Sequence, residues 1–130
     1  AALEYHSSEN FLEEDDIRYL MQAENCGGFI LTEVNKPIAY TIYSQSKMVL
    51  RILNLVVHQD YRRRGIASLL MDRLETRKRW NIMTSHVKES NLDMHLFLKS
   101  QEFTAIKVLD NYFEDGQNAY CFSRVKNYEE

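Results

Sequence analysis

The stretch VVHQDYRRRGIASLLMDRLE, residues 56–75, restricts the fold more than any other part of this 130-residue chain. It begins inside a run of β-branched and aliphatic residues that predicts a strand over 48–58. Beyond the arginines and Gly65, apolar residues recur at helical spacing on one face: Ile66, Leu69, Leu70 and Leu74. We therefore expect a strand, a tight basic turn and a helix that extends to about Trp80.

The residues before this unit predict a short helix and two more strands. Residues 13–25 begin with acidic side chains and are amphipathic, which favours a helix that ends at Gly27-Gly28. Strands are expected at 29–34 and 38–44. Because the connections between these strands are short, we expect them to pair antiparallel with the 48–58 strand.

The residues after this unit complete one domain. Their pattern predicts a strand at 81–87, a helix at 91–101, and strands at 103–109 and 119–125. Strand, helix and strand in succession favour a parallel pair with a right-handed crossover. The predicted fold is α/β (α+β), with one mixed, mostly antiparallel sheet of about six strands and flanking helices.

The basic turn has three interpretations. The free N–H groups at a helix N-terminus bind anions, and Gly65 and Ala67 would allow a diphosphate to approach the backbone closely. The arginines could instead form a solvated turn, or contact nucleic acid. A net charge of −3 and a pI near 5.8 argue against nucleic acid. The spacing matches neither a Walker A motif nor G-x-G-x-x-G.

Other features exclude several classes of protein. The histidines and the two cysteines have no metal-ligand spacing, so we expect no metal site. No apolar run is long enough to cross a membrane, and no signal peptide is recognised at the N-terminus. We expect a soluble, cytoplasmic protein.

Three segments, in the right order, resemble the GNAT (Gcn5-related N-acetyltransferase) superfamily. RRRGIA, residues 62–67, is similar to its Q/R-x-x-G-x-G/A signature. VKESNLDMHLFLKSQEF is similar to the V-R-x-S-N … L-Y-x-x-x-G-F segment. NYFEDGQNAY resembles the end of the ribosomal-protein-alanine (RimI-type) enzymes.

The resemblance implies that the chain binds acetyl-CoA through backbone groups. The pantetheine arm would pair with residues 55–57, and the Val57 N–H would polarise the thioester carbonyl. The pyrophosphate would bind at the turn, and Asn91 would lie near the thioester. The implied cofactor-binding residues are Leu55, Val56, Val57, Arg62, Arg63, Arg64, Gly65, Ile66, Ala67, Ser68 and Asn91.

Three positions depart from the RimI-type pattern. His86 stands at the position of the glutamate base, and an imidazole could serve as a base or be purely structural. Leu98 replaces the tyrosine acid, so another donor is needed; Tyr112 is the first candidate and Tyr120 the second. Glu102 replaces the glycine of the G-F pair.

The implied function is transfer of acetyl from acetyl-CoA to a primary amine, by direct attack in a ternary complex. The first candidate for the acceptor is a protein N-terminal α-amino group. The alternatives are a small-amine or lysine acetyltransferase, or a catalytically weak acyl-CoA-binding module. We expect the family's first strand to be missing ahead of ALEYHS, either because the chain is a truncated form or because that strand comes from elsewhere. A sheet edge left uncovered in this way would favour a homodimer.

Overall fold

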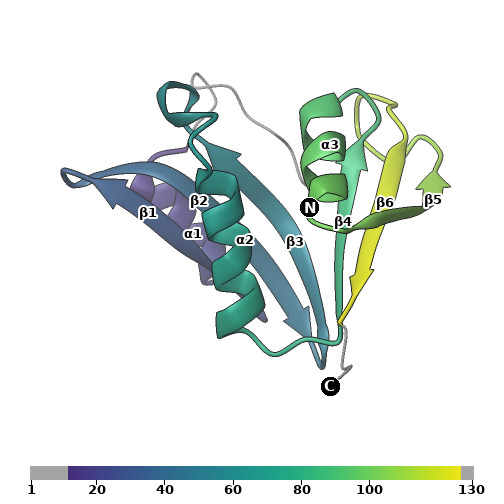
Figure 1. Ribbon diagram of the computed structural model, residues 1–130, viewed down its shortest axis with the longest axis horizontal. Helices are drawn as coiled ribbons and strands as arrows, with labels where there is room; N and C mark the ends of the chain where they lie inside the picture. Colours follow the sequence, from purple (N-terminus) through teal and green to yellow (C-terminus); the bar gives the residue numbers. More distant parts are fainter. Residues whose placement is uncertain (1–11, 127–130) are drawn as a thin grey trace.

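The computed structural model describes residues 12–126, which form one sheet with helices on both of its faces (Figure 1). The helices are α1 (Glu14–Met21), η2 (Gln59–Tyr61, a 3-10 turn), α2 (Ile66–Arg77) and α3 (Leu92–Ser100). The strands are β1 (Cys26–Glu33), β2 (Lys36–Ser46), β3 (Val49–Val57), β4 (Ile82–Lys88), β5 (Thr104–Leu109) and β6 (Ala119–Val125). The predicted fold class and order of elements are confirmed.

The sheet has the strand order β1-β2-β3-β4-β6-β5, and its only parallel pair among the described strands is β3 with β4. This pair is short: Val49–Arg51 match Ile82–Thr84, and the two strands then diverge. Figure 1 shows them meeting at one end and opening into a V at the other. The second half of β3 therefore has no strand partner on its β4 side.

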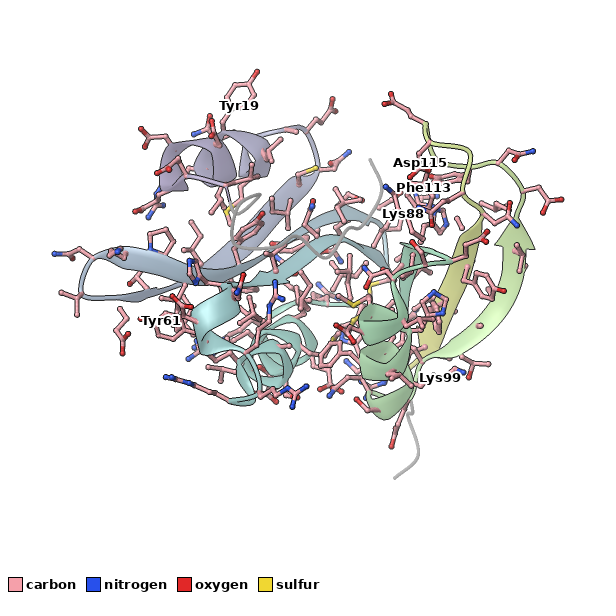
Figure 2. The ribbon with its side chains drawn as sticks, turned by 90° about the horizontal axis from the view of Figure 1, so that it is seen from above. Tyr19, Tyr61, Lys88, Lys99, Phe113 and Asp115 are labelled. Carbon is pink, nitrogen blue, oxygen red and sulfur yellow. The ribbon has the colours of Figure 1, made fainter. Side chains whose placement is uncertain are left out.

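The two faces of the sheet carry different helices. Figure 2, seen from above, shows α1 on one side of the sheet and α2 and α3 on the other. The larger core lies under α2 and α3 and includes Leu70, Met71, Leu74, Met94 and Leu98. The smaller core lies under α1 and contains Ile17, Tyr40, Ile42 and Val56. Both apolar faces of the sheet are thus covered, as a mixed sheet in an α/β domain requires.

A bulge in β3 keeps both ends of this strand packed against α2. The pairing with β2 skips Leu53, so that Tyr43 faces Ile52 and Ile42 faces Asn54. The buried Thr41 hydroxyl donates to the Asn54 carbonyl at 2.9 Å and fixes the irregularity. Because the bulge shifts the alternation of side chains, the apolar residues on both sides of it enter the same core: Leu50, Ile52, Leu55 and Val57.

The predicted end of the first helix is wrong. The helix ends at Met21, and Gly27 and Gly28 lie inside β1. A Cβ at Gly28 would come within 2.3 Å of the Thr41 carbonyl oxygen and 2.6 Å of Met21 Cε, and a Cβ at Gly27 within 2.5 Å of the Tyr43 hydroxyl. The glycines therefore allow close packing across the sheet and are not helix terminators.

The helix α2 ends earlier than the sequence predicts. The predicted end of α2 near Trp80 is three residues too late; Arg77 is the last helical residue, and Trp80 packs into the core. Among residues 12–126, no helix is long and apolar enough to cross a membrane. The expectation about the first strand falls on residues outside those described.

Candidate active site

The turn between β3 and α2 exposes backbone N–H groups at the start of a helix. Arg63 and Gly65 both adopt left-handed conformations, with φ of 63° and 78°. No side chain caps α2, and no acidic residue lies in its first turn. A Cβ at Gly65 would meet no atom within 4 Å, so the space above the turn is open. This geometry is that of an anion site made from backbone groups.

The arginine side chains near this turn have structural contacts. Arg62 Nε donates to the Val57 carbonyl at 3.1 Å, and the Arg64 guanidinium lies 5.2 Å from the centre of the Tyr61 ring. The Tyr61 hydroxyl in turn donates to the Glu33 carboxylate at 2.6 Å, and this bond raises the pKa of the phenol. These side-chain contacts hold the turn in place.

Two connected pockets run from this turn along β3. The first, of about 220 Å³, is lined by Val57, Tyr61, Arg62, Arg63, Gly65, Ile66, Ala67, Ser68 and Phe97. The second, of about 130 Å³, is lined by Leu55, Val57, Ala67, Asp93, Met94 and Phe97. Both touch the part of β3 that lacks a partner in β4. An extended ligand with linked polar and apolar groups could therefore lie along β3, from the turn into the V between β3 and β4.

Asn91 and Ser68 have partners within the fold. The Asn91 side-chain oxygen accepts a bond from the Met94 N–H at 3.3 Å and caps α3. The Ser68 hydroxyl accepts a bond from the Gln101 side chain at 3.3 Å. The Asn91 carboxamide nitrogen is not needed for the cap, so the side chain retains donors for a ligand.

His86 lies on the opposite face of the sheet from these pockets. Its neighbours Ser85 and Val87 are buried, and Val87 packs in the core beneath α3. Since side chains alternate along a strand, His86 points to the α1 face. The ring contacts Arg51 through Nε2 at 2.9 Å and the Tyr112 hydroxyl through Nδ1 at 3.1 Å.

Contacts and nearby charges act on the imidazole. One Arg51 nitrogen lies 2.9 Å from Nε2 and 3.3 Å from Nδ1, against the face of the ring. In the tautomer that carries its proton on Nδ1, the ring donates to the Tyr112 hydroxyl oxygen at 3.1 Å. Burial lowers the pKa of His86, and the positive charges of Arg51 and Lys107 lower it further. The imidazole is therefore neutral near pH 7, as a base requires.

Tyr112 is positioned by the loop between β5 and β6. Lys88 Nζ binds the Asp115 carboxylate at 3.1 Å and lies 5.4 Å from the centre of the buried Phe113 ring. Figure 2 shows these three side chains gathered at one place. The Tyr112 ring packs edge-on against Phe113 and edge-on against His86.

Tyr120 belongs to the other face of the sheet. Its ring lies 4.9 Å from that of His95 on α3 and packs against the larger core. Of the two tyrosines considered as the acid, Tyr112 is the one whose hydroxyl contacts His86, at 3.1 Å from Nδ1.

Two of the three positions that depart from the RimI-type pattern, Leu98 and Glu102, lie at the end of α3. Leu98 is 1% exposed and belongs to the core, so it has no chemical role. Glu102 has a φ of 69°, the conformation for which glycine is preferred. The N–H groups of Glu102 and Phe103 bond back to the Lys99 and Leu98 carbonyls at 3.0 and 2.9 Å, and Phe103 and Leu98 share a core. This is a Schellman cap with its apolar contact.

Sequence reasoning missed two residues beside His86. A pocket of about 380 Å³ on this face is lined by Ser44, Ser46, Val49, Arg51, Thr84, His86, Ile106, Lys107, Cys121 and Phe122. Arg51 and Lys107 each interrupt an apolar strand sequence, VLRILNLVV and TAIKVL. A charge inside an otherwise apolar strand is a signal for a polar site, and it could have identified both residues.

Comparisons with known proteins agree with this architecture. The family model described as "Acetyltransferase (GNAT) family" matches residues 2–103. The ribosomal-protein-S18-alanine N-acetyltransferase from Escherichia coli is similar in structure, with a TM-score of 0.73, 23% identity, and coverage of 93% of this chain and 82% of that chain. Ard1 from Thermoplasma volcanium has a TM-score of 0.75 and 25% identity, with 91% and 82% covered.

A third similar structure, of Arabidopsis thaliana NAA60, is a complex with a bisubstrate analogue; its TM-score is 0.73 at 16% identity, with 91% of this chain and 85% of that chain covered. These likenesses support the fold, and the family model extends over most of the chain. The protein belongs to the GNAT acetyltransferase family.

Proposed function

We propose that this protein transfers acetyl from acetyl-CoA to the α-amino group of a protein N-terminus, by direct attack while both substrates are bound. One observation carries the proposal: the V between β3 and β4 separates a backbone-built anion turn on one face from a neutral histidine on the other. Similar structures include an enzyme named for a ribosomal-protein alanine and NAA60 with a bisubstrate analogue.

The cofactor half of the proposed site uses the α2 and α3 face. The open turn at Gly65 would take the pyrophosphate, and the β4 side of residues 55–57, where no strand pairs with them, would take the pantetheine arm. The Val57 N–H would donate to the thioester carbonyl oxygen, where negative charge develops during attack. The residues proposed to bind acetyl-CoA are Leu55, Val56, Val57, Arg62, Arg63, Arg64, Gly65, Ile66, Ala67, Ser68 and Asn91.

The acceptor half uses His86 and Tyr112. The amine nitrogen attacks the thioester carbon, a C–N bond forms, and the C–S bond breaks. His86 would take the proton that the amine loses, at Nε2. The Tyr112 hydroxyl would give its proton to the departing thiolate and could recover one from Nδ1, 3.1 Å away. Leu98 has no part in this sequence.

Acetyl transfer to defined peptides tests the proposal. We expect free thiol to appear when the protein is mixed with acetyl-CoA and peptides with free N-termini, and acetylation by mass spectrometry at the α-amino group. Peptides with a blocked N-terminus and a free lysine provide the matched comparison. Acetylation of lysine or of small amines alone would indicate the alternative acceptors, and acetyl-CoA binding without any turnover would indicate a binding module.

A further inference from the structure

We propose that the pocket on the His86 face selects an acceptor amine that carries a carboxylate close to the amino group, and that Arg51 is the residue that recognises it. This inference rests on the proposed function and names the substrate class of the same site. The pocket, of about 380 Å³, contains Arg51, His86 and Lys107 and no aspartate or glutamate from residues 12–126.

The charges in this pocket are not balanced by the described part of the protein. Arg51 has contacts with His86 and with no carboxylate in residues 12–126. Lys107 is exposed and its charge reaches His86, whose pKa it helps to lower. Ser44, Thr84 and other polar side chains line the same space, so a carboxylate would find donors as well as charge.

Arg51 lies against the ring of the proposed base. Its guanidinium nitrogen lies 2.9 Å from Nε2 and 3.3 Å from Nδ1 of His86, so it packs over the face of the ring and not along the Nε2 lone pair, which lies in the ring plane. A guanidinium binds a carboxylate more strongly than it binds a neutral imidazole, because both partners are then charged. A carboxylate on the acceptor would therefore bind Arg51 and place the amine beside Nε2.

A neutral acceptor lacks this charge-assisted contact with Arg51. It would be held beside Nε2 less firmly, so its attack would be slower. One charge-assisted hydrogen bond at a partly exposed site corresponds to a preference of about tenfold in kcat/KM. The carboxylate could come from an acidic residue at a peptide N-terminus or from a free amino acid.

Three pairs of acceptors test the inference with the full chain. The first pair is a peptide with Asp or Asn at its first position, and the second pair is a peptide with Asp or Asn at its second position. The third pair is free alanine and alaninamide, which differ in the carboxylate. We expect about tenfold higher kcat/KM for the acidic member of at least one pair, and the pair that responds identifies the source.

Three variants assign the preference to residues. Arg51→Met should abolish the preference by lowering kcat/KM for the acidic member to that for the neutral one. Lys107→Met changes an exposed side chain and should reduce the preference without affecting folding. Lys36→Met is the control, because Lys36 is an exposed lysine at the start of β2, and this variant should keep the preference for the acidic member.

The possible failures are distinguishable. Equal rates for both members of each pair would overturn the inference and leave the proposed function standing. A preference that survives both Arg51→Met and Lys107→Met would also overturn it. If none of these acceptors is acetylated, the proposed function fails and the inference with it. Melting temperature and acetyl-CoA affinity show that each variant is folded.

Discussion

The two faces of the split sheet present different kinds of functional group. The α2 and α3 face offers backbone: the N–H groups of an uncapped helix, a left-handed Gly65 and a strand segment without a partner on its β4 side. The α1 face offers side chains: Arg51, His86 and Tyr112 come from three separate elements and meet within hydrogen-bonding distance. A backbone site suits a ligand common to a whole family, and a side-chain site suits an acceptor that differs between its members.

The largest expected effect is a loss of acetyl-CoA affinity when Gly65, on the α2 and α3 face, is replaced. Gly65→Glu should weaken acetyl-CoA binding by 100-fold or more, since it places a carboxylate at the proposed pyrophosphate site. Gly116→Glu is the matched control: this glycine also has a positive φ and open space around it, but it lies in the β5–β6 loop. Calorimetry measures both, and equal affinities for the two variants would contradict the assignment of the turn.

A change at His86 should affect the acceptor face alone. We expect His86→Ala to reduce kcat by about 100-fold, the usual contribution of a positioned base. Because His86 points away from the cofactor pockets, the affinity for acetyl-CoA should not change. Steady-state kinetics and calorimetry give the two values, and an unaltered kcat would return His86 to a structural role.

The pH dependence should also belong to the acceptor face. The pKa of His86 lies below its usual 6.5, chiefly through burial. A protonated imidazole has no lone pair, so kcat should fall as the pH drops through this lowered pKa, and stay constant above it. Arg51→Met removes a positive charge and should move the fall to higher pH, whereas His86→Ala should abolish it. A pH profile that is identical in all three proteins would exclude His86 as the titrating group.

The smallest expected effect lies outside both faces. Glu102→Gly should raise the free energy of unfolding by about 1 kcal/mol, because Glu102 is held at a φ of 69°. Gln101→Gly, one residue earlier at a φ of −96°, should lower it instead. Denaturant unfolding compares them, and kcat should be the same in both. A loss of stability in Glu102→Gly would show that the cap needs the glutamate side chain.

The difference between the faces also explains what could be predicted from sequence. The turn at Gly65 is coded by neighbouring residues, so its helix and its open backbone could be foreseen. The approach of Arg51 to His86 depends on a parallel pairing of only three residues per strand, which begins at Val49 and Ile82, 33 positions apart in the sequence. Local patterns contain no record of that register, so they can mark Arg51 as a charge within a strand but cannot place it beside His86.

Gly27 and Gly28 show the same limit in the fold. A pair of glycines after an amphipathic run predicts a helix end, and the local pattern offers no reason to continue into a strand. The reason is tertiary, because a Cβ at Gly27 would meet the Tyr43 side chain and a Cβ at Gly28 would meet the Thr41 carbonyl oxygen, both in β2. Conversely, the 119–125 strand was predicted at its observed bounds, because turn residues and alternation define both of its ends locally.

Amide chemical shifts measured during a titration with acetyl-CoA test the central claim most directly. At 15.4 kDa, the chain is well suited to two-dimensional NMR spectra. The account predicts that the large shifts belong to the Val57 amide and to residues 63–68, with smaller changes at Arg51 and Lys107. Large shifts at Arg51 and Lys107, with the turn unchanged, would place the cofactor on the wrong face and contradict the account.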